Sequence, residues 1–194
     1  MEDNDLPKVM FYGKYRVVTR FKNVENKEGE YRLVIDKVYP CGSRTNHTIR
    51  LNIFSSKKTL NITEIKGNIT LLKPYDDDLT LDLNVSTWGS TGGWIPNHYI
   101  LIRKKACSSL RNLYGNAWFT LLNAFNVSTD RCPIPLGTYI TSGYDLTKFE
   151  DMNLPKLIFY GKYKLVGRIK NVENKEVGCI VAETNLIRPW ETPI

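Results

Sequence analysis

The chain has 194 residues and a formal net charge of +7, from 27 basic and 20 acidic side chains. Hydrophobic residues make up 42% of the sequence and aromatic residues 11%, which excludes a disordered chain and suits one globular domain with additional material. No apolar run approaches the roughly 20 residues that a membrane-spanning helix needs.

The N-terminus nearly repeats a segment close to the C-terminus. Residues 2–28 match residues 150–176 at 19 of 27 positions, without gaps. We interpret segment 1–30 as a partial duplicate of a strand and turn, the fragment of an upstream copy or of a fused tandem gene, and 33–190 as one complete domain. The repeat has Tyr31 where the second copy has Cys179. We therefore expect the C-terminal copy to hold the strand position, while the repeat competes for it, pairs with a neighbouring molecule or stays unpaired.

Short runs of β-branched and aromatic residues between turn formers predict an all-β fold. We expect a two-layer β-sandwich or β-cup of about eight antiparallel strands with one short helical segment. In Lys162–Lys170 apolar and basic residues alternate, as in a strand with one buried face. The polar segment Asn171–Glu176 predicts a turn, so the last two strands should form a hairpin. The expected strands are Leu33–Tyr39, Thr48–Phe54, Thr59–Thr63, Asn68–Leu72, Leu79–Thr87, Tyr99–Arg103, Lys162–Lys170 and Cys179–Ile187.

The helical candidate is Ser108–Phe125, where apolar residues recur at helical spacing. Gly115-Asn116 interrupts this pattern, so the segment should form one or two short pieces. Ser108 or Ser109 is the expected cap at its N-terminus.

Glycosylation motifs and cysteines indicate an extracellular protein. Five Asn-x-Ser/Thr sequons point to the secretory pathway, although such sequences also suit strand edges. Four cysteines without a C-x-x-C pair favour two disulfides over a metal or thioredoxin-type site, and three pairings are open. The chain begins without a signal-peptide pattern, so either the protein is cytosolic and its sequons and cysteines are accidental, or Met1 is an internal methionine of a longer secreted product. We favour the second interpretation, because the chain also begins within a repeat unit. The candidate glycosylation sites are Asn46, Asn61, Asn68, Asn84 and Asn126.

Few residues suggest an enzyme. Neither His47 nor His98 lies in a nucleophile-elbow, metalloprotease or phosphate-loop motif. Asp76–Asp78 lacks the spacing of a cation site and is interpreted as a solvated turn. We expect no catalytic residue, no metal and no cofactor. The basic side chains are spread along the chain, which favours a solubilising surface or attraction to anionic lipid headgroups over nucleic-acid binding.

Several apolar residues are candidates for contact with a hydrophobic ligand. Trp88–Pro96 places two tryptophans around a glycine-rich loop, either as core residues of a hairpin or at the mouth of the cup, where indoles would contact a membrane interface. In the expected helical segment, Leu121, Leu122 and Phe125 would either line a cavity or pack against the sheet. The cavity or rim candidates are Trp88, Trp94, Ile95, Leu121, Leu122, Phe125, Phe159, Tyr160 and Tyr163.

The C-terminal half carries a family resemblance. The sequence CPIPLGTY at 132–139 is followed by a Leu-Pro pair, a GKYKL strand, a polar turn and Gly-Cys-Ile. This order resembles the lysosomal ganglioside activator group and its secreted insect relatives, some of them chemosensory, in the ML-type lipid-recognition superfamily. The resemblance covers about Leu33 to Pro189. It implies a β-cup around a lipid-sized cavity, with disulfides Cys41–Cys179 and Cys107–Cys132. This chain lacks the further bridges of that group near the cavity mouth, which leaves ganglioside specificity in doubt.

Together these observations predict a secreted, non-enzymatic protein that holds an acyl chain or other hydrophobic ligand for transport or presentation. The expected partners are a lipid, a membrane surface, and a receptor or hydrolase, with no nucleic acid. One alternative is an extracellular β-sandwich module for chemosensory or immune recognition without a lipid. Another is a cofactor that presents lipids to a hydrolase.

Overall fold

A computed structural model describes residues 32–42, 47–59, 62–152, 160–188 and 190–191. Within these residues the chain folds into eight strands, two short α-helices and one 3-10 helix. The all-β class is therefore confirmed. In chain order the elements are β1 (Arg32–Pro40), β2 (Ile49–Lys57), β3 (Thr63–Leu71), β4 (Thr80–Trp88), β5 (Trp94–Lys104), α1 (Ala106–Tyr114), α2 (Asn116–Ala124), β6 (Gly137–Asp145), η1 (Leu146–Asp151), β7 (Gly161–Lys170) and β8 (Glu176–Ile187).

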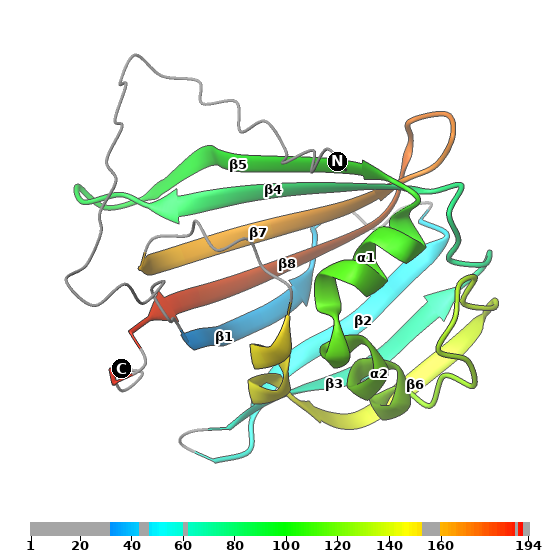
Figure 1. Ribbon diagram of the computed structural model, residues 1–194, viewed down its shortest axis with the longest axis horizontal. Coiled ribbons are helices and arrows are strands. Elements are labelled where there is room, and N and C mark those ends of the chain that lie inside the picture. The colour runs from blue at the N-terminus through cyan, green and yellow to red at the C-terminus, as the bar shows by residue number, and fades with distance from the viewer. Residues whose placement is uncertain (1–31, 43–46, 60–61, 153–159, 189, 192–194) are drawn as a thin grey trace, which may run out of the picture.

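The strands form two antiparallel sheets. The larger sheet has the order β1-β8-β7-β4-β5 and the smaller one the order β2-β3-β6. Figure 1 shows the sheets as two layers, with α1 and α2 leading from the level of β5 to that of β6. The sheets meet along β1 and β2, and β2 also contacts β8. The result is a sandwich that is closed on the β1–β2 side and bridged by the helices.

Alternation along β7 separates the two faces of the larger sheet. Leu165, Gly167 and Ile169 face the smaller sheet and the helices, which we call the inner face, and the lysines face outward. A Cβ atom on Gly178 of β8, opposite Ile169, would lie 2.9 Å from the Cβ of Ile49 in the smaller sheet. The predicted alternation and the β7–β8 hairpin are both confirmed.

The C-terminal copy of the repeat holds the strand position, as expected. Strand β7 lies between β4 and β8 and pairs with both over most of its length. Cys179 in β8 is joined to Cys41 after β1, and Cys107 in α1 is joined to Cys132. Both disulfides implied by the resemblance are confirmed. The segment 1–30 and Asn46, Asn61 and Phe159 lie outside the described residues.

The helical segment consists of two helices of nine residues, divided at Gly115, where the sequence predicted an interruption. Gly115 has φ +54°, a value that glycine adopts more readily than other residues. The expected serine cap is wrong, because α1 begins at Ala106 and Lys105 occupies the cap position without a side-chain bond. No helix in the described part of the chain combines the length and apolarity that crossing a bilayer requires.

Two of the strand predictions need correction. Of the expected strand Thr59–Thr63, only Thr63 belongs to a strand among the described residues: the backbone N–H groups of Lys58 and Thr59 both donate to the Ile62 carbonyl in the connection between β2 and β3. The edge strand β6 (Gly137–Asp145) was missed: its threonine, tyrosine and isoleucine residues favour a strand, but two glycines interrupt the pattern.

Two buried clusters fill the space between the sheets. One surrounds Cys107 and Trp118 at the α1 end, and the other surrounds Phe125, Tyr144 and Phe149 between β1, the smaller sheet and α2. Tyr144 and Phe149 meet edge to face with ring centroids 5.2 Å apart. The described helices and the smaller sheet therefore pack on a core of buried apolar side chains.

Candidate functional site

The inner face of the larger sheet continues beyond these two clusters. One row runs across four strands, from Tyr99 on β5 through Val85 on β4 and Leu165 on β7 to Ala182 on β8. Leu101 of β5 lies beside this row, opposite Leu83. We call Val85, Tyr99, Leu101 and Leu165 the inner floor.

The inner floor is an apolar part of the sandwich interior that the two core clusters do not cover. All four side chains are only half-buried, and none belongs to either core cluster or to the residues packed against them. Neighbouring strands lie about 4.8 Å apart, so a row across four strands spans roughly 15 Å. The floor thus offers a flat aliphatic and aromatic surface, wide enough for an alkyl chain.

Tyr163 lies on the inner face next to Leu165, at the end of the inner floor that is farther from the helices. It pairs with Thr87 and Thr184 on the inner face and is only 4% exposed. Its ring lies 5.8 Å from that of His98. Burial raises the pKa of the Tyr163 hydroxyl, which stays protonated at neutral pH and can act as a hydrogen-bond donor.

The tryptophan pair lies on the other side of the sheet. Strands β4 and β5 extend through Trp88 and Trp94, so the loop is only the glycine-rich turn between them. The two rings meet edge to face at 5.1 Å, and Trp88 is 48% exposed. By register both indoles are on the outer face, so they are neither core residues nor part of the cup interior.

Two lysines accompany these indoles. Lys162 Nζ lies 5.8 Å from the Trp88 ring centroid and 6.0 Å from that of Trp94, and Lys164 Nζ lies 5.3 Å from that of Trp94. These are cation–π distances. We call Trp88, Trp94, Lys162 and Lys164 the outer aromatic–basic cluster. It combines one exposed and one half-buried indole with two positive charges at the β4–β5 end of the sheet, opposite the β7–β8 turn (Figure 1).

The other predicted ligand residues are dispersed. Ile95 pairs with Thr87 at the exposed end of β5, and Tyr160 is exposed with the Arg188 guanidinium 5.3 Å from its ring. The three candidates on and after α2 belong to the core: Leu122 and Phe125 are buried in the two clusters, and Leu121 packs against the second. The structure therefore brings Tyr163 next to the inner floor and the tryptophans to the outer face.

The floor residues themselves were not singled out from the sequence. By simple strand alternation Val85 shares a face with Leu81 and Leu83, and Tyr99 shares a face with Leu101. The sequence does not reveal the order of the strands in the sheet. The apolar faces of β5, β4, β7 and β8 form one surface only because these strands are neighbours in that order.

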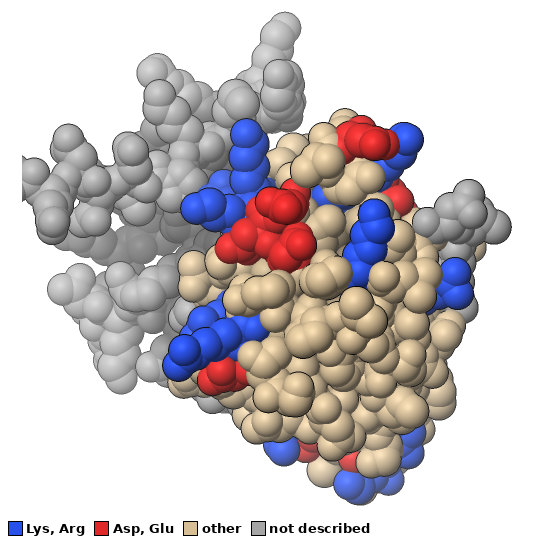
Figure 2. Space-filling model, turned by 90° about the vertical axis from the view of Figure 1, so that its right-hand side faces the viewer, with Lys and Arg blue, Asp and Glu red and all other residues tan. Residues whose placement is uncertain are grey.

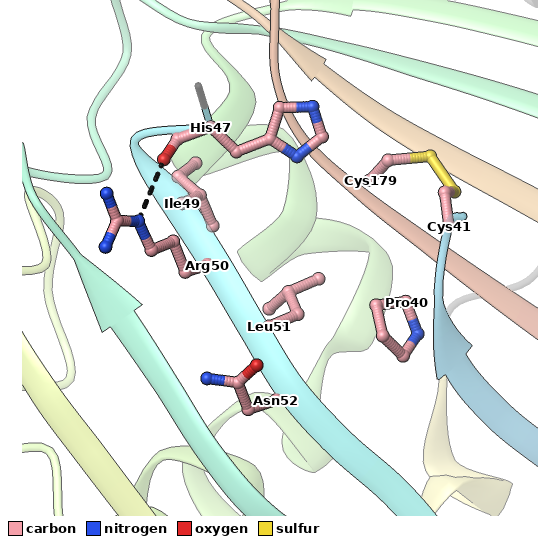
Figure 3. A pocket seen from close by; sticks show the side chains of 8 residues that line it. All are labelled: Pro40, Cys41, His47, Ile49, Arg50, Leu51, Asn52 and Cys179. Atoms are coloured by element: carbon pink, nitrogen blue, oxygen red, sulfur yellow. Dashed lines mark hydrogen bonds between the residues drawn. A yellow bond between two sulfur atoms is a disulfide. The ribbon is translucent and has the colours of Figure 1, made fainter. Parts of the chain in front are cut away.

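A small pocket lies where β1 ends and β2 begins (Figure 3). The Cys41–Cys179 disulfide and Ile49 contribute to its wall, and its volume is about 80 Å³. His47 Nε2 lies 3.2 Å from a Glu176 carboxylate oxygen, and Arg168 Nε lies 3.3 Å from the other. The volume suits a few waters, far less than the roughly 300–1,000 Å³ of typical ligand sites. Both sulfurs are bonded to each other, so neither is available as a thiolate nucleophile.

A second, larger and open pocket of about 440 Å³ lies between α2 and the segment 127–131, with a mostly polar lining. It is on the helix side of the molecule. Figure 2 shows the end that carries the helices, where basic and acidic side chains are interspersed among broad areas that carry neither. Of these two pockets, neither is an enclosed apolar cavity of acyl-chain size.

The acidic run at 76–78 has a structural role that was not anticipated. Asp77 accepts hydrogen bonds from the Ser108 backbone N–H at 2.8 Å and from the Ser108 hydroxyl at 2.6 Å. Burial alone would raise the pKa of Asp77, but the bonds from Ser108 lower it below its usual value. Asp77 is thus the remote cap of α1. The sulfurs of Cys107 and Cys132 lie nearby but are joined in a disulfide.

Known proteins give no further assignment. A comparison of the chain with protein-family models finds no family that matches, and a comparison with curated proteins finds no match either.

Proposed function

We propose that this protein is a secreted, non-enzymatic binder of a hydrophobic small molecule, such as an acyl chain, which lies against the inner floor. The observation that carries the proposal is the floor itself: four apolar side chains on the interior side of a sandwich that remain half-buried and outside both core clusters. A core normally buries such residues against one another, so an apolar guest would complete the packing.

Burial of the ligand would supply the binding free energy. One fully buried methylene contributes about 0.8 kcal/mol, so ten contribute about 8 kcal/mol, from which association costs of at least about 4 kcal/mol are subtracted. Micromolar affinity therefore requires a longer alkyl chain, about 15 buried methylenes.

Extracellular localisation and contact with membranes belong to the same proposal. Two disulfides are typical of proteins that fold in oxidising compartments. The outer aromatic–basic cluster pairs indoles, which favour membrane interfaces, with lysines, which attract anionic headgroups. It would hold the protein at a lipid surface while a ligand is taken up or released.

The test compares two neighbouring residues of β7 that face opposite ways. Leu165 is part of the inner floor and Val166 faces outward, and both are half-buried. In a binding assay with a fluorescent fatty acid, Leu165→Thr should weaken binding about tenfold, equivalent to about 1.4 kcal/mol, and Val166→Thr should leave it unchanged. Equal affinities for the wild type and both variants, or no saturable binding by the wild type, would contradict the proposal.

A specific observation also favours the alternative, an extracellular interaction module. The two clusters between the sheets are well packed, and the two pockets described above are either too small or too polar for a lipid tail. On this reading the floor is a contact surface for a protein partner. The fatty-acid assay distinguishes the two readings, because a module of this kind does not bind the probe saturably.

A further inference from the structure

The outer faces of the two sheets share one unusual arrangement. Asn68 lies in the middle of β3, the central strand of the smaller sheet, and Asn84 lies in the middle of β4, between β7 and β5. Each is the asparagine of a sequon, Asn-Ile-Thr or Asn-Val-Ser. By register both point outward, away from the core clusters.

An exposed isoleucine lies directly opposite each of these asparagines. Asn68 pairs with Ile140 on the edge strand β6, and Asn84 pairs with Ile100 on the edge strand β5. Ile140 is 60% exposed and Ile100 is 52% exposed. Directly paired side chains in a sheet have Cβ atoms about 5 Å apart, so anything attached to the asparagine lies over the isoleucine.

A second large apolar side chain lies diagonally across from each sequon. Phe54 on β2 is 56% exposed and pairs with Lys66, two residues from Asn68. Ile102 on β5 is 58% exposed and pairs with Asp82, two residues from Asn84. Asn68 therefore lies between exposed apolar residues on the two strands that flank it, and Asn84 lies beside two exposed isoleucines of the edge strand β5.

Exposed apolar residues at the edge of a sheet favour aggregation, because an edge strand also presents unpaired backbone groups to other chains. Protein surfaces usually counter this with charged residues or with a covering group. An N-linked glycan is bulky, hydrophilic outward and attached at the surface. At these two positions it would cover both apolar neighbours and sterically block edge-to-edge pairing.

We propose that Asn68 and Asn84 are the glycosylated positions that shield the outer sheet faces, and that their glycans keep β5 and β6 from associating with other copies of the chain. This inference rests on the extracellular part of the proposed function and not on ligand binding. The local geometry allows it: the Asn84 amide donates one hydrogen bond to the Asn97 side chain at 2.6 Å, and a glycosylated amide retains one N–H for this bond.

Asn126 provides a comparison within the same chain. It is exposed after α2, in a loop rather than on a sheet face, and its side-chain amide donates to the Ile140 carbonyl at 3.1 Å. Its sequon can be removed by Ser128→Ala, which leaves Asn126 and this hydrogen bond in place. Loss of this sequon should not affect self-association.

The experiment uses the full chain, directed into the secretory pathway of insect cells by an added leader peptide. Mass spectrometry of peptides, before and after enzymatic removal of glycans, measures occupancy at each sequon. We expect Asn68 and Asn84 to be occupied in most molecules. Peptides that show both positions unmodified in the secreted protein would overturn the proposal.

Self-association is then measured by light scattering, on native protein treated with a glycosidase and on the variants Asn68→Gln, Asn84→Gln and Ser128→Ala. Loss of the two sheet-face glycans should raise the aggregation rate severalfold, and Ser128→Ala should not. Introducing Ile100→Thr and Ile140→Thr into the glycan-free protein should restore solubility. Glycosidase acts on protein that has already folded, so a folding defect in a variant does not obscure the result.

Unchanged aggregation after complete removal of the glycans would refute the shielding role. The fatty-acid assay is run on the same preparations. A protein that carries both glycans but binds no fatty acid would contradict the proposed function and leave this inference intact. A protein that binds fatty acid but carries no glycan at Asn68 and Asn84 would contradict this inference and leave the ligand-binding function intact.

Discussion

Gly167 of β7 and Ile180 of β8 lie opposite each other on the inner face, and a side chain on Gly167 would require its neighbours to move. A Cβ atom on Gly167 would lie 3.2 Å from Ile180 Cγ2 and 3.2 Å from Leu83 Cδ2. In the N-terminal repeat the equivalent residue is Thr19. The repeat therefore differs from β7 at a closely packed position of the inner face, which gives a steric reason, besides Cys179, for β7 to hold this position.

Replacing Gly167 with the residue of the repeat tests this relationship. Gly167→Thr should lower the free energy of unfolding by about 1–3 kcal/mol, because the added atoms overpack the inner face. The measurement is urea denaturation, with Val166→Thr as the control on the outer face. Equal stability of the Gly167→Thr variant and the wild type would show that Leu83 and Ile180 move apart at little cost.

Removal of residues 1–30 should leave the thermal midpoint nearly unchanged. The physical reason is that β7 already pairs with both of its neighbours and that β8 is covalently joined to Cys41. Differential scanning calorimetry of the truncated and full chains provides the comparison. A fall of many degrees would mean that the repeat contributes to the folded domain.

Asp77 should stabilise the protein by capping α1. Asp77→Ala removes the acceptor of both Ser108 bonds and should cost about 1 kcal/mol at neutral pH. Asp78→Ala is the control, because no side-chain bond to α1 is formed by that residue within the described structure.

The Asp77 contribution should also depend on pH. Its folded pKa is lowered, so the stabilisation is fully present above the unfolded value of about 3.9 and is lost as the pH falls through the folded value. The stability difference between the wild type and Asp77→Ala should therefore shrink in acid. A difference that grows on acidification would have the wrong sign for this assignment.

The two disulfides should contribute different amounts to the stability of the fold. Cys41–Cys179 spans 138 positions and Cys107–Cys132 spans 25. On the chain-entropy model these loops correspond to about 5 and about 3.5 kcal/mol as upper values. Replacing both cysteines of one pair with serine should therefore lower the thermal midpoint more for the long loop, as calorimetry would show. The opposite order would indicate that the Cys107–Cys132 bridge stabilises α1 directly.

The outer aromatic–basic cluster should mediate binding to anionic vesicles. Lys162→Gln with Lys164→Gln should reduce sedimentation of the protein with vesicles that contain phosphatidylserine, and added salt should reduce binding by the wild type. The matched control is Lys104→Gln, a basic residue at the opposite end of β5. Equal losses in the control and the double variant would mean that net charge, rather than this cluster, determines binding.

Sequence reasoning predicted the elements with clear periodicity. The basic and apolar alternation of β7, the polar turn after it and the break at Gly115 each have a local cause, and the structure contains all three. Strand β6 could not be predicted in this way, because its stability comes from pairing with β3 and from Tyr144 in the core rather than from its own composition.

The site was harder to predict for the same reason. The side of the sheet on which Trp88 and Trp94 lie depends on the register of β4 with β5 and β7, which a single sequence does not reveal. The sequence favoured these conspicuous aromatic residues as contacts of the cup, whereas the inner floor is made of ordinary strand residues such as Val85 and Leu165. The disulfide pairing was implied only by the family resemblance.

Native mass spectrometry of the secreted, glycan-trimmed protein tests the central claim most directly. The account predicts a species heavier than the polypeptide by the mass of one lipid, which solvent extraction removes and which Leu165→Thr, but not Val166→Thr, diminishes. A protein that carries no such mass, and gains none when incubated with fatty acids, would contradict it.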